Sequence, residues 1–177
     1  MDKKIILFIG GPGSGKTTLI NGLAKKGYIC YPEISREVTL EAKKNGIDQL
    51  FLENPLLFSE LLLEGRIKQY QSALNEMENI VFIDRGIPDV LAYMHYIGDA
   101  YPPSFNEASK TYKYHKVFIL PPWEEIYTCD NERYETYEQA SLIHQHLIDT
   151  YQSYGYELCE VPKATLEERI EFVLKNL

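Results

Sequence analysis

The sequence lacks an apolar run long enough to cross a membrane. A transmembrane helix needs about 18 or more consecutive apolar residues, whereas apolar runs such as 5–9 and 80–83 each suit one short strand. The first of these follows Met1-Asp2-Lys3-Lys4 directly and ends in a glycine-rich loop. A secretory signal peptide has a longer apolar region and small residues at its cleavage site. We therefore expect a cytoplasmic protein without a membrane partner.

Cysteine is also scarce. The three cysteines, Cys30, Cys129 and Cys159, lie far apart and form neither a CxxC pair nor an even set. This spacing excludes a disulfide framework of the kind that holds small secreted domains together. It favours free thiols in a reducing compartment.

Positive charge is in deficit. Lysine and arginine number 18 against 26 aspartates and glutamates, which gives a formal net charge of −8. A general nucleic-acid-binding protein needs a basic surface to bind the phosphate backbone, so we expect no nucleic-acid partner. A small anionic ligand needs only a few local positive groups and is not excluded.

What the sequence does contain is an alternation of apolar strands and helical segments. The 177 residues suit one domain spanning residues 1–177. This alternation predicts an α/β fold with a parallel sheet and helices on both faces. The expected strands are 5–9, 28–31, 80–83, 117–120 and 156–161. Helices are expected over 16–26, 35–45, 54–77, 88–97 and 136–154 and from 165 onward, whereas 98–114 is expected to be irregular.

A phosphate-binding loop follows the first strand. Gly10-x-x-x-x-Gly15-Lys16-Thr17 matches the Walker A pattern, in which backbone N–H groups and the following helix N-terminus surround a phosphate. Lys16 is expected to reach the β- and γ-phosphates of ATP, and the Thr17 hydroxyl is expected to bind Mg²⁺. The predicted nucleotide-binding residues are Gly10, Gly11, Pro12, Gly13, Ser14, Gly15, Lys16, Thr17 and Thr18.

An acidic residue follows the third predicted strand. Asp84 is the expected second ligand for Mg²⁺, because P-loop sites hold the ion with a carboxylate from a neighbouring strand. The next residue is Arg85, where many P-loop hydrolases carry a water-activating glutamate. A guanidinium there can stabilise charge on a transferring phosphoryl group or hold an acceptor, but it cannot act as a base. A surface salt bridge is the alternative role for Arg85.

Two further residues are candidates for catalysis. Glu33 follows the second strand, at the sheet edge where ligands bind in open α/β folds, and it could act as general base. Its alternative is a solvated loop glutamate. Arg133 lies in a polar, lid-like segment at about 123–136, which could close over the triphosphate and exclude water. A solvated loop arginine is the alternative there.

The roles of three other residues stay open. Asp89 could bind acceptor hydroxyls or could be a carboxylate favoured by the dipole at a helix N-terminus. Tyr93 could stack on a flat acceptor ring or belong to the core. Trp123 could flank the nucleotide base or pack beneath the lid-like segment.

Together these residues resemble the P-loop kinases of nucleosides and nucleotides. That group shares the order of the Walker A loop, an acid after the second strand, an Asp-Arg pair and a late lid arginine. Ribosylnicotinamide kinases are similar in having a Glu followed shortly by Arg-Glu, as in Glu33-Ile34-Ser35-Arg36-Glu37. The resemblance implies a three-layer P-loop fold with the kinase-like strand order 2-3-1-4-5.

The whole chain also resembles a family of small bacterial ATPases labelled AAA-type. The segments that carry this resemblance are Asp84-Arg85-Gly86-Ile87-Pro88-Asp89, Leu120-Pro121-Pro122-Trp123 and Asp130-x-Glu132-Arg133. The family implies ATP binding. The chain departs from AAA+ machines because it has no helical lid domain and no acidic residue after Asp84, so we do not expect a hexameric motor.

Three functions follow as hypotheses. The first is a Mg²⁺-dependent kinase that transfers the γ-phosphate of ATP to a nucleoside- or nucleotide-like acceptor. The second is an ATPase switch that acts with a protein partner, and the third is a non-catalytic nucleotide-binding module. Arg85, Glu33 and the lid-like segment favour the kinase. A GTPase is disfavoured because the sequence has no Asn-Lys-x-Asp motif. The protein is expected to be a monomer or homodimer.

Overall fold

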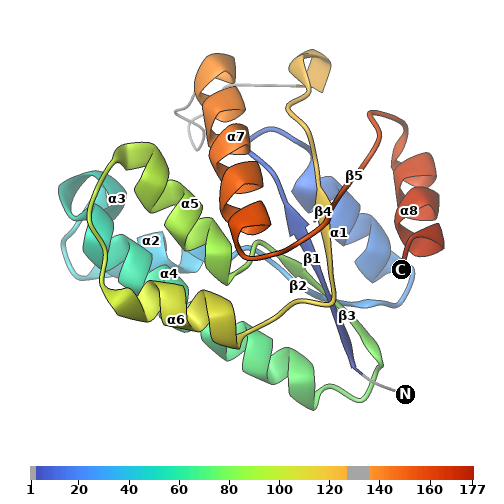
Figure 1. Cartoon of the computed structure of the whole chain (residues 1–177), viewed down its shortest axis with the longest axis horizontal. Coiled ribbons are helices and arrows are strands. Elements are labelled where there is room, and N and C mark those ends of the chain that lie inside the picture. The colour runs from blue at the N-terminus through green and yellow to red at the C-terminus, as the bar shows by residue number, and fades with distance from the viewer. Residues whose placement is uncertain (1–2, 127–135) are drawn as a thin grey trace.

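The computed structural model describes residues 3–126 and 136–177. Five strands form one parallel sheet in the order β2-β3-β1-β4-β5 (Figure 1). The predicted α/β class and the strand order implied by the kinase resemblance are therefore confirmed. The strands are β1 (Lys4–Ile9), β2 (Ile29–Tyr31), β3 (Ile80–Asp84), β4 (Lys116–Ile119) and β5 (Leu158–Glu160).

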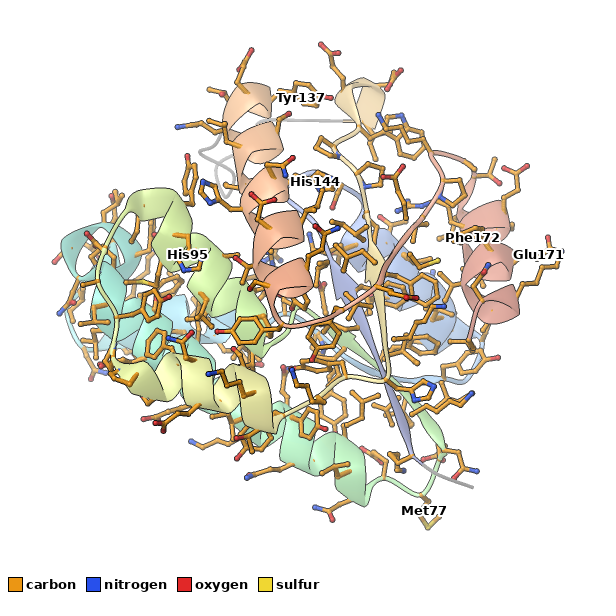
Figure 2. The ribbon with its side chains drawn as sticks, in the orientation of Figure 1. Met77, His95, Tyr137, His144, Glu171 and Phe172 are labelled. Atoms are coloured by element: carbon orange, nitrogen blue, oxygen red, sulfur yellow. The ribbon has the colours of Figure 1, made fainter. Side chains whose placement is uncertain are left out.

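Helices cover both faces of this sheet. Helices α1 and α8 pack on one face, where Leu23 and Ile170 join Phe8 of β1 in one buried cluster. Phe172 of α8 lies with its ring 6.5 Å from Phe118, whereas Glu171 points outward (Figure 2). Helices α4, α5 and α7 cover the other face. The helices are α1 (Lys16–Lys25), α2 (Ser35–Lys44), α3 (Leu50–Glu53), α4 (Pro55–Asn75), α5 (Ile87–Ile97), α6 (Pro103–Thr111), α7 (Tyr137–Ser153) and α8 (Leu166–Lys175).

Local sequence signals set several helix ends. Asn54 caps α4 by accepting a hydrogen bond from the Leu57 N–H at 3.1 Å, with Pro55 in the first turn. Thr136 and Thr165 begin α7 and α8 with capping boxes. These three helix starts were predicted from sequence and are confirmed.

Helix α6 differs from the sequence-based expectation. The stretch 98–114 was expected to be irregular because of Pro102-Pro103, but α6 begins at Pro103. Proline is well suited to the first turn of a helix, since its missing N–H would have no intrahelical partner there. Phe105 and Ala108 then bury one face of α6 in a cluster that includes Leu91 and Met94 of α5. Tertiary burial therefore stabilises a helix that has no side-chain cap.

Parallel pairing brings the loops that follow the strands to one edge of the sheet. Phe8 of β1 is the register partner of both Asp84 of β3 and Phe118 of β4. The loop after β1 consequently lies beside the loops after β3 and β4. Among the helices that the structure describes, none is long and apolar enough to cross a membrane.

Candidate functional site

The phosphate-binding loop connects β1 to α1 and is shaped by close backbone approach. Gly10 has φ +153°, and a Cβ there would lie 2.6 Å from the carbonyl oxygen of Leu120. Gly15 has φ +81° and occupies the N-cap position of α1. A side chain at either position would be strained, so glycine lets the loop turn tightly into the helix. Thr17 and Thr18 follow as exposed residues in the first turn of α1.

Lys16 is buried against this loop. Its ammonium donates hydrogen bonds to the carbonyl oxygens of Gly10 at 2.8 Å and Gly11 at 3.0 Å. Burial lowers the pKa of Lys16 to about 8, and Arg85 contributes in the same direction, while Asp84 acts against it. A phosphate would offer this cation a stronger, charged acceptor than the neutral carbonyls do.

Asp84 ends β3 with its side chain 3% exposed. Within residues 3–126 and 136–177, its Oδ1 atom has no hydrogen-bond partner. Burial raises the pKa of Asp84, and Lys16 opposes the shift. A buried carboxylate oxygen without a partner is costly, and a hydrated divalent cation would satisfy it. The residue therefore fits the expected role of a Mg²⁺ ligand beside Thr17.

Arg85 occupies a left-handed backbone conformation with φ +66°, which it alone adopts among the described non-glycine residues. The backbone N–H of Arg85 donates to the Phe8 carbonyl at 2.9 Å, which fixes the turn after β3. Its Nε atom lies 2.5 Å from Oε2 of Glu33, and its Nη1 atom lies 3.3 Å from Oδ1 of Asp89. Burial lowers the pKa of Arg85, but these carboxylates outweigh burial and raise it overall. Arg85 is a half-buried, fixed cation, and not an exposed salt-bridge partner.

Glu33 faces this arginine from the loop after β2. Its Oε1 atom accepts hydrogen bonds from the backbone N–H of Ser35 at 3.1 Å and from Arg66 at 3.3 Å. Burial raises the pKa of Glu33, but Arg66 and Arg85 outweigh burial and lower it below its usual range. Glu33 is therefore ionised at neutral pH. It is held by two hydrogen-bond donors and by the ion pair with Arg85, unlike a solvated loop glutamate.

Two arginines at this edge of the sheet were missed from sequence. Arg66 of α4 is 4% exposed and donates from Nη1 to the Gly86 carbonyl at 3.0 Å. Arg169 of α8 is also buried and donates from Nη2 to the Ser14 carbonyl of the phosphate-binding loop at 3.3 Å. Arg66 follows Leu62 and Leu63 at helical spacing. The sequence therefore places a charged residue on the apolar face of the helix, and this pattern could have identified Arg66 as a buried arginine.

Asp89 occupies the N-terminal turn of α5 and is buried. Its Oδ2 atom accepts hydrogen bonds from the Gly86 N–H at 3.0 Å and from the Tyr151 hydroxyl at 2.5 Å. Together with the Arg85 contact, these bonds make Asp89 a helix-capping carboxylate, which was one of its two expected roles.

Tyr93 is half-buried and packs against the apolar core. Its ring lies 6.4 Å from that of Phe58, edge to face, and its hydroxyl group donates to the Phe51 carbonyl at 3.5 Å. This position matches the alternative that Tyr93 belongs to the core.

Trp123 lies beside the phosphate-binding loop. The Arg169 guanidinium lies 5.8 Å from the centre of its ring. Both residues line a pocket of about 360 Å³, together with Gly13, Thr18 and Leu166. The lid-like segment begins here with a 3₁₀ turn over Glu124–Ile126. The predicted lid residue Arg133 lies outside the described residues.

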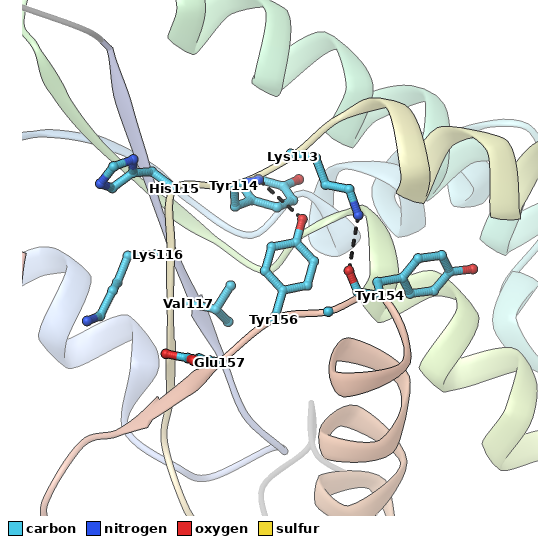
Figure 3. A pocket seen from close by; sticks show the side chains of 9 residues that line it. Lys113, Tyr114, His115, Lys116, Val117, Tyr154, Tyr156 and Glu157 are labelled. Carbon is cyan, nitrogen blue, oxygen red and sulfur yellow. Dashed lines mark hydrogen bonds between the residues drawn. The ribbon is translucent and has the colours of Figure 1, made fainter.

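A second pocket, of about 390 Å³, lies at the opposite end of the strands, where β4 and β5 begin (Figure 3). Lys113 donates there to the Tyr154 carbonyl at 3.2 Å, and its ammonium lies 5.2 Å from the centre of the Tyr156 ring. The Tyr156 hydroxyl accepts a hydrogen bond from the Tyr114 N–H at 3.2 Å. The Tyr114 hydroxyl in turn accepts one from the Ile87 N–H at 3.1 Å. These contacts connect the end of the sheet where β4 and β5 begin to the start of α5.

Solved structures of three kinases or related proteins share this fold. Deoxyadenosine kinase from M. mycoides has a TM-score of 0.71 at 16% identity, with 97% of each chain covered. Thymidylate kinase from Candida albicans has a TM-score of 0.72 at 16% identity, covering 99% of this chain and 91% of that one. The NadR protein in complex with NR reaches 0.77 at 18% identity, over 98% of this chain and 50% of the NadR chain.

Sequence identities this low do not assign an activity to the chain. The structural similarity shows a P-loop nucleotide-binding fold similar to that of nucleoside and nucleotide kinases. No curated protein matches the chain. The model of a family described as AAA domain matches residues 5–169, which include the phosphate-binding loop, Asp84 and Arg85. The chain belongs to this AAA domain family.

Proposed function

We propose that this protein is a Mg²⁺-dependent kinase that transfers the γ-phosphate of ATP to a hydroxyl group of a nucleoside-like acceptor. The observation that carries the proposal is the 2.5 Å contact between Glu33 Oε2 and Arg85 Nε. This contact places Glu33, the proposed base, beside Arg85, the proposed phosphate-binding cation, at the edge of the sheet where Lys16 also lies.

The donor nucleotide would bind along the loop 10–18. Lys16 would hold the β- and γ-phosphates, and Thr17 with Asp84 would hold Mg²⁺, which neutralises charge on the phosphates when bound. The pocket between Trp123 and Arg169 lies next to Gly13 and Thr18. Its aromatic ring and guanidinium suit a flat purine base.

Glu33 would act as general base toward the acceptor. The proton of the acceptor hydroxyl passes to Glu33, and the acceptor oxygen forms a bond to the γ-phosphorus. The bond between that phosphorus and the β–γ bridging oxygen breaks, and its electron pair leaves with ADP. Arg85 would stabilise the negative charge on the transferring group. The lowered pKa of Glu33 keeps the carboxylate ionised at neutral pH, so that it is able to accept a proton.

A hydroxyl acceptor fits this site better than a monophosphate acceptor does. An alcohol needs a base as it attacks, whereas a phosphate monoester is already ionised at neutral pH and needs none. Arg66 and Arg85 are both paired with the Glu33 carboxylate, which would repel an incoming phosphate.

The test is product formation from ATP, Mg²⁺ and a panel of nucleosides, nucleotides and nicotinamide riboside, followed by mass spectrometry. Wild type is expected to yield a phosphorylated nucleoside. Lys16→Ala is expected to abolish it and Glu33→Gln to lower its rate about 100- to 10,000-fold, whereas the exposed controls Lys25→Ala and Glu41→Gln retain it. Release of phosphate without any phosphorylated acceptor, unaffected by Glu33→Gln, would instead support an ATPase that acts with a protein partner.

A further inference from the structure

We propose that Arg66 is a positioning residue that holds Glu33 and the Asp84–Gly86 loop at a fixed separation, so that only one oxygen of Glu33 serves the acceptor. This inference rests on the proposed kinase function. It assigns a role to a residue of α4, outside all the loops at the edge of the sheet.

The guanidinium of Arg66 joins two loops. Nη1 donates to the Gly86 carbonyl at 3.0 Å, and Nη2 donates to Glu33 Oε1 at 3.3 Å. The first contact reaches the loop after β3, and the second reaches the loop after β2. A guanidinium is planar and rigid, so two bonds from one fork set the distance between their acceptors.

The two oxygens of Glu33 have different surroundings. Oε1 is held by Arg66 and by the backbone N–H of Ser35, whereas Oε2 faces Arg85. Oε1 is therefore the anchored oxygen, and Oε2 is the one that would take the proton from the acceptor. A misplacement of about 1 Å can lower a catalytic rate about 100-fold, so the loss of one of the two donors that hold Oε1 is expected to lower the rate.

Charge supports the same assignment. Glu33 is faced by Arg66 from α4, by Arg85 and Asp84 from the end of β3, and by Lys16 from the start of α1. Burial raises the pKa of Glu33, and Arg66 is the strongest of the groups that lower it. Replacement of Arg66 by a neutral side chain is therefore expected to raise the pKa of Glu33.

The kinetic test compares Arg66→Met, Arg66→Lys and the exposed control Lys68→Met, which lies on the same helix. We expect Arg66→Met to lower kcat about 100-fold with little change in the acceptor KM, and to move the acid limb of the pH–rate profile to higher pH. Arg66→Lys keeps the charge but loses the planar pair of N–H donors that contacts both loops. We therefore expect kcat to fall while the acid limb of the pH–rate profile stays near that of wild type. Lys68→Met is expected to match wild type.

A double-mutant cycle separates positioning from packing. In a Glu33→Gln background, Arg66→Met is expected to have little further effect on kcat, because Arg66 acts through Glu33. The full 100-fold loss in that background would overturn the inference. So would a rise in the acceptor KM at unchanged kcat, which would make Arg66 an acceptor-binding residue.

A measurement without turnover keeps the two proposals distinguishable. The ¹³C NMR titration of the Glu33 carboxyl is expected to give a higher pKa in Arg66→Met than in wild type or Arg66→Lys. If wild type phosphorylates no acceptor, the proposed kinase function fails, and this titration still tests Arg66. An unchanged titration midpoint in Arg66→Met would contradict the role of Arg66 whether or not the protein is a kinase. If Arg66→Met does not fold, Arg66→Lys takes its place in the double-mutant cycle. The effect of Arg66→Lys on kcat is then compared between the wild-type and Glu33→Gln backgrounds.

Discussion

Arg85 and Glu33 form an ion pair, with Nε 2.5 Å from Oε2, that joins the loops after β3 and β2. The first prediction concerns its cation. Arg85→Lys is expected to lower kcat about 100- to 1,000-fold, because an ammonium cannot reproduce the fixed donor geometry toward a transferring phosphoryl group. The Kd of ATP is expected to change little. Steady-state kinetics and equilibrium nucleotide binding measure the two effects, and a large loss of ATP affinity at unchanged kcat would contradict the role.

A second prediction concerns pH. Burial lowers the pKa of Lys16 to about 8, with help from Arg85, so the ammonium loses its proton in the free protein above that pH. Nucleotide phosphates bind the protonated form, and ATP affinity is therefore expected to fall as pH rises, by about tenfold at pH 9 relative to pH 7. Calorimetry in buffers of different ionisation enthalpy should also detect proton uptake on binding at pH 8.5. A Kd that stays constant up to pH 9.5 would argue against a lowered pKa.

The third prediction concerns the metal. Asp84→Asn removes a buried charge that has an unpartnered oxygen among the described residues. Activity at saturating ATP is expected to require at least tenfold more Mg²⁺, since one ligand carboxylate is lost. Thermal stability is expected to stay equal or to increase, because an amide is less costly to bury than a carboxylate. An unaltered Mg²⁺ titration would exclude Asp84 as a ligand.

The fourth prediction concerns stability. Tyr151→Phe leaves the ring in place but removes the hydroxyl that donates to Asp89 Oδ2. Loss of a buried hydrogen bond to a charged group is expected to lower the free energy of unfolding by about 1.5–3 kcal/mol. Urea denaturation measures the change, with Tyr96→Phe on the neighbouring helix as control. Equal stabilities of the two variants would mean that this hydrogen bond contributes little.

The fifth prediction uses the single tryptophan. Trp123 borders the pocket beside the phosphate-binding loop, so ATP is expected to change its fluorescence emission. Arg169→Ala removes the guanidinium above the ring and is expected to weaken ATP binding about tenfold, in keeping with the loss of one stacked cation. A signal that is insensitive to ATP would place the donor base elsewhere.

Features that depend on neighbouring residues in the chain were predictable from sequence. The Walker A loop, the capping boxes at Thr136 and Thr165 and the Asp84-Arg85 pair after the third strand are each encoded within a few residues. The order of the strands came from family resemblance, because the apolar strand pattern alone does not specify which strands are neighbours.

Features that depend on distant segments were not predictable in the same way. Arg66 is identified by its acceptors, which lie 20 and 33 positions away along the chain. Arg169 contacts a loop 155 positions away. Helix α6 is stabilised by burial of Phe105 against other helices, and a local pattern does not include this energy.

The two strands at the edges of the sheet, β2 and β5, contain three residues each. A short edge exposes few unpaired N–H and C=O groups to the strand of another chain. Strand-to-strand aggregation is therefore disfavoured at both ends of the sheet. A homodimer is therefore not expected to extend the sheet from one subunit into the next.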